Sequence, residues 1–265
     1  SPWWQDYAYI EDHFARLNTA LTRGKPVVRV GVIHPVESYW LHWGPAEQTD
    51  GIRRQMDERF QSLTDWLVNG GVDFDFLCES LLPSQCRQGG APLRVGEMAY
   101  DAVVVPGCET LRSTTLERLE AFQRAGGRLI FLGDAPRYAE AKPDERGKRL
   151  YEQSRHTEFS REALLDALEP VRLIDIRDEN GVRTDNLLHQ LRQDGDGLWL
   201  FLAHSREPYN NDVPTRQNIR LTVKGAYHAR IYDTLTGDIL PANAEIQGNK
   251  TVIRATLYDH DSLLL

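Results

Sequence analysis

Up to about residue 180, hydrophobic positions alternate between two periods. Over residues 5–23 and again over 51–69, apolar side chains recur three and four positions apart, which predicts amphipathic helices. Thr114 and Glu117 form a capping-box pattern at the start of a third helix. Short apolar runs rich in β-branched residues predict buried strands at 26–34, 72–77, 101–106 and 128–133. Strands that alternate with helices in this way predict an α/β fold, with a parallel sheet and helices on both of its faces.

Two polar segments interrupt this alternation. Residues 35–50 are rich in aromatic side chains but show no sustained period, so we expect a loop there. Residues 134–157 contain a dense run of charges, which is typical of a solvated surface loop. Beyond it, the pattern predicts a helix at 160–168 and a further strand at 171–176.

After about residue 180 the helical period disappears and strand-like patterns follow one another. Turn signals separate them, such as Asp194-Gly-Asp-Gly197 and Gly248-Asn249. These patterns predict an antiparallel β module. The expected strands are 186–193, 198–204, 219–224, 227–232, 238–246, 251–258 and 262–265. The expected division of the chain is a helical lead-in at 1–24, an α/β domain at 25–180 and the β module at 181–265.

Composition and charge exclude several classes of protein. The chain has 265 residues, of which 41% are hydrophobic and 26% charged, as in ordinary globular domains. No stretch approaches the ~18 consecutive apolar residues of a membrane-spanning helix, so no membrane partner is expected. The formal net charge of −8 argues against a dedicated nucleic-acid binder, which presents a basic face. The 3 cysteines are too few for a disulfide-built module and favour the cytoplasm, while no other signal indicates a compartment.

Cys108 is the candidate for nucleophilic chemistry. It follows the strand predicted at 101–106, at the edge of the sheet where open α/β folds place ligands and where amidotransferase-type hydrolases place a cysteine. The segment lacks the second glycine of a G-x-C-x-G elbow, and the histidines available as a base are His156 and His189. A structural thiol is therefore the leading interpretation, and a cysteine hydrolase is the alternative.

Patterns that would hold a cofactor or a metal ion are missing from the sequence. Neither G-x-G-x-x-G nor G-x-x-x-x-G-K-[ST] occurs, and bulky residues follow the first strand, where a phosphate-binding loop would be small. Cys78 and Cys86 are not spaced as zinc ligands, and His34 and His42 do not form H-E-x-x-H. We therefore expect no cofactor and no metal.

The segment at 35–50 is the candidate for substrate binding. Indole and phenol faces stack on the apolar faces of sugar rings, and a carboxylate or imidazole can hold hydroxyl groups. The alternative is that the two tryptophans pack against another domain. The candidate substrate-binding residues are Glu37, Tyr39, Trp40, His42 and Trp43.

Several segments together resemble the accessory region of large bacterial glycoside hydrolases. The opening helix, followed by Lys25-Pro-Val-Val-Arg-Val-Gly-Val-Ile-His-Pro35, resembles a junction at which a helix leaves a catalytic barrel and enters a flavodoxin-like domain. Asp101-Ala-Val-Val-Val-Pro-Gly107 and Ala125-Gly-Gly-Arg-Leu-Ile-Phe131 look like the glutamine-amidotransferase-like domain of family 42 β-galactosidases. The segment Leu188–His204 is similar to the β part of related enzymes, including α-L-rhamnosidase-like proteins.

The resemblance implies a flavodoxin-like, class I glutamine-amidotransferase-like domain followed by the antiparallel β module. It implies a non-catalytic accessory or oligomerisation fragment whose catalytic barrel precedes Ser1. The partners it implies are that barrel, carbohydrate bound by the parent enzyme and, in a homo-oligomer, further copies of the chain. No catalytic residue of the family maps onto this sequence. The alternative function is an amidotransferase-like hydrolase that uses Cys108.

Overall fold

The computed structural model describes residues 2–208, 210 and 212–265, which form two compact units. One unit, here called the parallel-sheet unit, contains Val28–Val68 and Val72–Arg172. The other, here called the antiparallel unit, contains the chain up to Val27, Asn69–Gly71 and Leu173–Leu265. Each unit encloses hydrophobic clusters of its own. The fold is therefore mixed α/β, with one parallel sheet and several antiparallel sheets.

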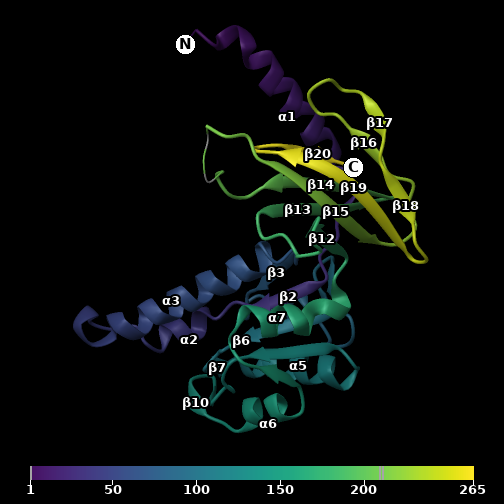
Figure 1. Ribbon diagram of the computed structural model, residues 1–265. Coiled ribbons are helices and arrows are strands. Elements are labelled where there is room, and N and C mark those ends of the chain that lie inside the picture. Colours follow the sequence, from purple (N-terminus) through teal and green to yellow (C-terminus); the bar gives the residue numbers. More distant parts are fainter. Residues whose placement is uncertain (1, 209, 211) are drawn as a thin grey trace. The chain divides into compact units, whose positions relative to one another are not determined.

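A five-stranded parallel sheet is the centre of the first unit (Figure 1). Its strands, in spatial order, are β11 (Arg155–Thr157), β8 (Arg128–Leu132), β6 (Ala102–Pro106), β2 (Val30–Ile33) and β3 (Phe74–Leu77). All four apolar runs of the first part of the sequence form strands of this sheet, as predicted. The strand expected at 171–176 does not join it, because β12 (Ile174–Asp178) pairs antiparallel with β15 (Arg216–Lys224).

Helices cover both faces of the parallel sheet. One face packs against α3 (Ala46–Val68) and α7 (Arg161–Leu168). The opposite face packs against α4 (Leu82–Gln85), α5 (Ser113–Arg124) and α6 (Arg146–Glu152). Successive side chains of β6 point to opposite faces of the sheet. Val104 packs in the hydrophobic cluster with α3 and α7, while Val103 and Val105 pack in the cluster with α4, α5 and α6. This alternation explains why the strand reads as a continuous apolar run.

The two segments expected to be loops contain regular structure, so that expectation is wrong in part. Residues 35–50 form α2 (Val36–Trp40) and the start of α3. Residues 134–157 contain the short strands β9 (Tyr138–Ala139) and β10 (Lys142–Pro143), together with α6 and β11. α2 has 5 residues, which is too short to show a helical period, and α6 buries only Gly147 and Leu150.

Three short strands complete the described part of this unit outside the main sheet. They are β4 (Leu93–Val95), β5 (Met98–Tyr100) and β7 (Thr110–Leu111). β4 and β5 pair with each other, and β7 lies parallel to β9. The pairing of β7 with β9 ties the segment after β6 to the segment after β8.

The antiparallel unit is built from two four-stranded sheets that share a core. The first sheet has the order β1 (Lys25–Pro26), β13 (Leu187–Asp194), β14 (Gly197–His204) and β20 (Ser262–Leu264). The second has the order β12, β15, β19 (Lys250–Tyr258) and β18 (Ala244–Ile246). Leu191, Leu200 and Leu202 of the first sheet pack with Leu221 and Ile253 of the second. The hairpin of β16 (Arg230–Tyr232) and β17 (Ile239–Pro241) completes the described strands of this unit. The single strand expected at 238–246 is wrong, because these residues are divided between β17 and β18, which belong to different sheets.

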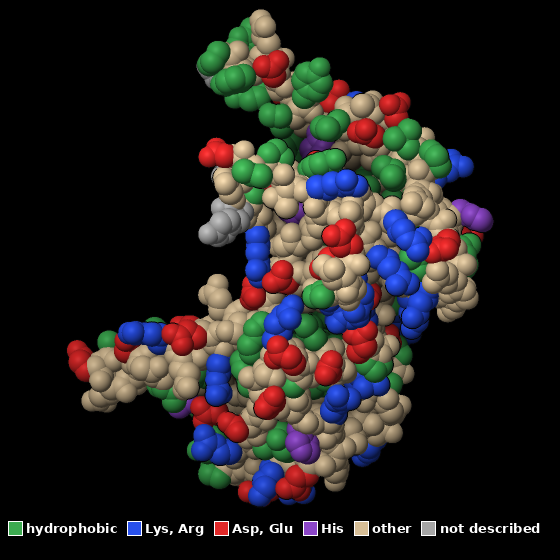
Figure 2. Space-filling model, in the orientation of Figure 1, with side chains coloured by type: hydrophobic (Ala, Val, Ile, Leu, Met, Phe, Trp, Pro, Cys, Tyr) green, Lys and Arg blue, Asp and Glu red, His purple; other side chains and the backbone are tan. Residues whose placement is uncertain are grey.

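Helix α1 (Tyr7–Leu21) belongs to the antiparallel unit. Its carboxyl-terminal half buries Leu17 and Ala20 against Leu264. Its amino-terminal half is covered by exposed apolar side chains, visible as green atoms at the top of Figure 2. Among the described residues, no helix combines the length and apolar character needed to cross a bilayer.

Candidate functional site

A cavity of about 580 Å³ opens at the carboxyl ends of three strands of the parallel sheet. His34 follows β2, Cys108 lies two residues beyond β6, and Asp134 lies two residues beyond β8. In open parallel sheets, ligands bind outside the carboxyl ends of the strands, where the strand order reverses. Here the chain passes from β2 to β3 on one side of β2, and then from β3 to β6 on the other side of β2, so the cavity lies at such a point.

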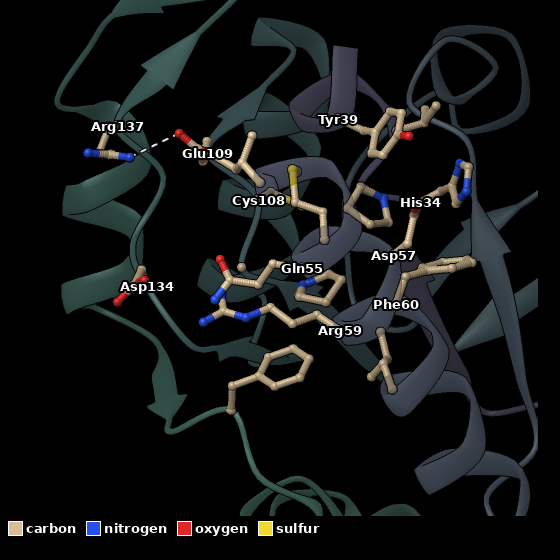
Figure 3. A pocket seen from close by; sticks show the side chains of 18 of the residues that line it. His34, Tyr39, Gln55, Asp57, Arg59, Phe60, Cys108, Glu109, Asp134 and Arg137 are labelled. Atoms are coloured by element: carbon tan, nitrogen blue, oxygen red, sulfur yellow. Dashed lines mark hydrogen bonds and ion pairs between the residues drawn. The ribbon is translucent and has the colours of Figure 1, made fainter. Parts of the chain in front are cut away.

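Helix α3 supplies one wall of the cavity. Gln55 and Arg59 are four positions apart, so they lie on one face of the helix, and both extend into the middle of the view in Figure 3. The Arg59 guanidinium lies over the Phe159 ring, 5.3 Å from its centroid. Among the polar side chains of the lining, Gln55, Asp57, Arg59 and Asp134 make no hydrogen bond or ion pair with any other described residue.

Cys108 lines the cavity but is only 1% exposed. Burial raises the pKa of its thiol well above the usual value, and the carboxylates of Glu79 and Glu37 raise it further. A thiol in such surroundings stays protonated at neutral pH, whereas a nucleophilic cysteine needs its thiolate.

The histidines considered as bases do not form a dyad with Cys108 by any hydrogen bond among the described residues. His156 stacks on Tyr151, with ring centroids 4.3 Å apart, and His189 belongs to β13 of the other unit. His34 lines the cavity, and burial lowers its pKa. The geometry therefore offers no physical support for nucleophilic catalysis at Cys108.

A hydrogen-bond network holds the segment after β6 against α2. The buried Ser38 hydroxyl accepts hydrogen bonds from the backbone N–H groups of Glu109, at 2.9 Å, and Thr110, at 3.2 Å. The Glu109 carboxylate pairs with His42 Nε2 at 2.6 Å and with the Arg137 guanidinium at 2.9 Å. These contacts fix the backbone on either side of the cavity mouth.

A second group of charges includes Glu79 and Glu37, the two carboxylates that act on the Cys108 thiol. Glu37 forms an ion pair with Arg112. The buried Glu79 accepts a 2.8 Å hydrogen bond from the Arg112 backbone N–H. Burial raises the pKa of Glu79 to about 7, against the opposing effect of that hydrogen bond.

The structure brings only part of the predicted site together. Tyr39 lines the cavity with Cys108, whereas Glu37 is held in an ion pair with Arg112 and His42 in a hydrogen bond with Glu109. Trp40 and Trp43 are 58% and 71% exposed and lie outside the lining. Trp43 stacks with the Arg53 guanidinium, 5.0 Å from the ring centroid.

Sequence reasoning missed several lining residues. Asp134 was detectable, because it follows a predicted strand at the same edge of the sheet as Cys108. Gln55 and Arg59 carried no such signal, since they lie on the polar face of an amphipathic helix. Phe159 comes from the segment between β11 and α7 and joins the cavity only through tertiary packing.

Metal-binding groups are not assembled in this cavity or elsewhere in the part of the chain that the structure describes. No set of 3 or more His, Cys, Asp or Glu side chains is placed to hold an ion. The polar lining offers planar groups that donate and accept hydrogen bonds, among them the Gln55 amide, the Arg59 guanidinium and the Asp134 carboxyl.

In its fold, the chain is similar to parts of glycoside hydrolase chains. It matches a rhamnosidase from Novosphingobium sp. PP1Y with a TM-score of 0.65 and 17% identity. It matches α-L-fucosidase isoenzyme 2 from Paenibacillus thiaminolyticus with a TM-score of 0.55 and 10% identity. It also matches Gan42B, a GH42 β-galactosidase from G. stearothermophilus, with a TM-score of 0.54 and 11% identity.

These matches cover nearly all of this chain but less of the solved chains. They span 99%, 97% and 90% of this chain, and 24%, 51% and 40% of the rhamnosidase, the fucosidase and the galactosidase. No protein-family model matches the sequence, and no curated protein matches it. At such low identities the likeness concerns the fold alone.

Proposed function

We propose that this chain is a non-catalytic accessory fragment of a carbohydrate-active glycoside hydrolase. The observation that carries the proposal is the extent of the fold similarity. At least 90% of this chain resembles solved glycoside hydrolases, while it spans 24–51% of their length. The reaction then belongs to another domain of the parent protein, a catalytic barrel acting on β-galactosides, α-L-rhamnosides or related sugars.

The order of strands supports a flavodoxin-like, amidotransferase-like assignment for the parallel-sheet unit. Numbered along the chain, the parallel strands lie in the order 2-1-3-4-5, from β3 through β2, β6 and β8 to β11. That is the order of flavodoxin-like doubly wound sheets. The buried, protonated Cys108 supports a degenerate site in place of an active amidotransferase.

We propose that the aromatic segment at 35–50 contributes to carbohydrate binding in the parent enzyme. The exposed indoles of Trp40 and Trp43 supply the stacking faces. The Glu37–Arg112 ion pair and the His42–Glu109 hydrogen bond hold this segment in place, and Tyr39 faces the cavity. In the full enzyme, Trp40→Ala or Trp43→Ala is expected to raise KM, while unchanged kinetics in a folded variant would remove this role.

The exposed apolar side chains of α1 support a contact with the catalytic barrel. Tyr9 and Phe14 of α1 are each more than half exposed, as is Trp4 in the short 3-10 turn just before this helix, and neighbouring exposed apolar side chains of this kind mark interaction surfaces. In a homo-oligomer, a second copy of this chain would cover the same face. Self-association of this chain at micromolar concentration, measured by sedimentation, would favour an oligomerisation module, and a strictly monomeric chain would weaken it.

A hydrolysis screen tests the proposal most directly. The chain and its Cys108→Ala variant are assayed against nitrophenyl glycosides and nitrophenyl esters. We expect no turnover on any substrate. Ester hydrolysis that disappears in Cys108→Ala would establish the alternative cysteine hydrolase, and glycoside hydrolysis that survives the substitution would show that this chain contains a catalytic carboxylate pair.

A further inference from the structure

We propose that the cavity at the carboxyl ends of β2, β6 and β8 binds a neutral saccharide unit. The choice of carbohydrate as the ligand class rests on the proposed function, whereas the cavity and its lining do not. All of the lining residues belong to the parallel-sheet unit. The site is therefore complete within that unit and needs no further domain.

The dimensions of the cavity suit a small ligand. Its volume of about 580 Å³ falls within the roughly 300–1,000 Å³ of small-molecule pockets. Helix α3 forms one wall, and the segments after β6 and β8 form the other (Figure 3). The Ser38 hydrogen bonds and the pairing of β7 with β9 hold this second wall, so the cavity is formed before any ligand arrives.

The polar side chains of the lining complement vicinal hydroxyl groups. A sugar hydroxyl both donates and accepts, and two neighbouring hydroxyls fit a planar group that offers two atoms. Arg59 offers two parallel donors, Asp134 offers two acceptors, and Gln55 offers one of each. None of the three makes a hydrogen bond or an ion pair with another described residue, so a ligand can take their donors and acceptors without breaking such a bond.

Aromatic rings stand among these polar groups. Tyr39, Phe60 and Phe159 all line the cavity. The Phe60 ring is fixed by the rings of His34 and Phe76, at centroid distances of 5.3 Å and 5.0 Å. Rigid ring faces beside planar polar groups are the combination that accommodates a sugar, whose C–H faces are apolar and whose edge is polar.

The charge of the lining disfavours an anionic ligand. Glu109 and Arg137 neutralise each other in their ion pair. Asp57 and Asp134 then face a single guanidinium, that of Arg59. Because carboxylates outnumber the available cation, a phosphate or a uronate meets net repulsion, whereas a neutral saccharide does not.

Binding can be measured on the chain as it stands. Neutral hexoses and 6-deoxyhexoses are titrated by saturation-transfer NMR and calorimetry, with glucuronate and glucose 6-phosphate as charged comparators. We expect at least one neutral sugar to saturate with one site per chain and the charged comparators to bind more weakly. Arg59→Ala and Asp134→Ala should each reduce the affinity about tenfold, because each removes hydrogen bonds to a charged group.

Arg54→Ala is the matched control. Arg54 lies on the same helix, is paired with Asp50 and stands outside the lining, so its removal should leave sugar affinity unchanged. Tyr39→Phe and Gln55→Ala provide second variants that change the lining without altering a charge. Circular dichroism and thermal melting establish that each variant is folded.

Three results would overturn the inference. The first is a folded wild-type chain that no neutral sugar saturates. The second is binding that Arg59→Ala, Asp134→Ala and Gln55→Ala leave intact, and the third is tighter binding of the charged comparators. A chain that binds sugar but hydrolyses esters through Cys108 would support this inference and contradict the proposed function. A chain that hydrolyses no substrate and binds no sugar would contradict this inference and leave the proposed function standing.

Discussion

Replacing Glu79 by glutamine is expected to remove a pH dependence of stability from the parallel-sheet unit. Glu79 is 2% exposed and accepts a hydrogen bond from the Arg112 backbone N–H. Burial raises the pKa of its carboxyl group from the usual 4.5 to about 7, and the nearby Glu37 carboxylate contributes in the same direction. Glutamine keeps an oxygen for the Arg112 N–H but cannot ionise.

The direction of the effect follows from the two pKa values. Because the pKa in the folded state lies above the unfolded value of 4.5, the folded state holds the proton more tightly. The stabilising contribution is fully present below pH 4.5 and is lost as the pH rises to about 7. At about 1.36 kcal/mol per pKa unit, ionisation of Glu79 lowers the free energy of unfolding by about 3 kcal/mol.

Urea unfolding of the wild type and Glu79→Gln at several pH values measures this contribution. All other titrating groups are common to both chains, so they cancel in the difference between the two free energies of unfolding. That difference should move by about 2–3 kcal/mol in favour of Glu79→Gln between about pH 5 and pH 8. The exposed Glu152 supplies the control Glu152→Gln. A Glu79→Gln difference as flat as that of the control would refute the reasoning.

Three further substitutions test the packing that supports the site and the two units. Ser38→Ala leaves the backbone N–H groups of Glu109 and Thr110 without their acceptor, so the free energy of unfolding measured by denaturation should fall by about 1–3 kcal/mol. An unchanged free energy of unfolding would show that water replaces the hydroxyl. Phe122→Ala empties a fully buried position of the parallel-sheet unit and should cost about 3–5 kcal/mol, seen as a lower melting temperature; a change below about 1 kcal/mol would contradict the packing. Gly24→Ala places a Cβ against the β13 backbone at a φ of +57°, so the antiparallel unit should melt earlier, and an unchanged melt would show that this turn is free to adjust.

The sequence predicted the parallel sheet because its strands are buried on both faces. Continuous apolar runs such as 101–106 are distinctive, and the helices between them show a clear period. The fifth strand, β11, was missed because its residues Arg155, His156 and Thr157 are polar and lie at the edge of the sheet. The strand near residue 174 was predicted, but its partner could not be, since an apolar run does not reveal which sheet will accept it.

The candidate site was predictable only where it follows the rule for parallel sheets. Cys108 was found at the carboxyl end of a strand, and the same rule points to Asp134. The aromatic segment was recognised by composition, yet α2 turns Tyr39 toward the cavity and leaves Trp40 exposed. Adjacent residues on a helix point in different directions, so Tyr39 and Trp40 are neighbours in the sequence but their side chains do not lie at the same site.

We propose that the site at the switch point of the sheet holds no nucleophile, because its one thiol, that of Cys108, is buried. The rates at which iodoacetamide alkylates the three cysteines, followed by mass spectrometry of the native chain at about pH 8, measure whether Cys108 is an accessible thiolate. Cys78 is partly exposed and serves as the internal standard, and the buried Cys86 serves as the inert reference. We predict that Cys78 is modified first and that Cys108 reacts as slowly as Cys86, because only an accessible thiolate reacts. Modification of Cys108 faster than Cys78 would contradict the claim and restore the cysteine hydrolase.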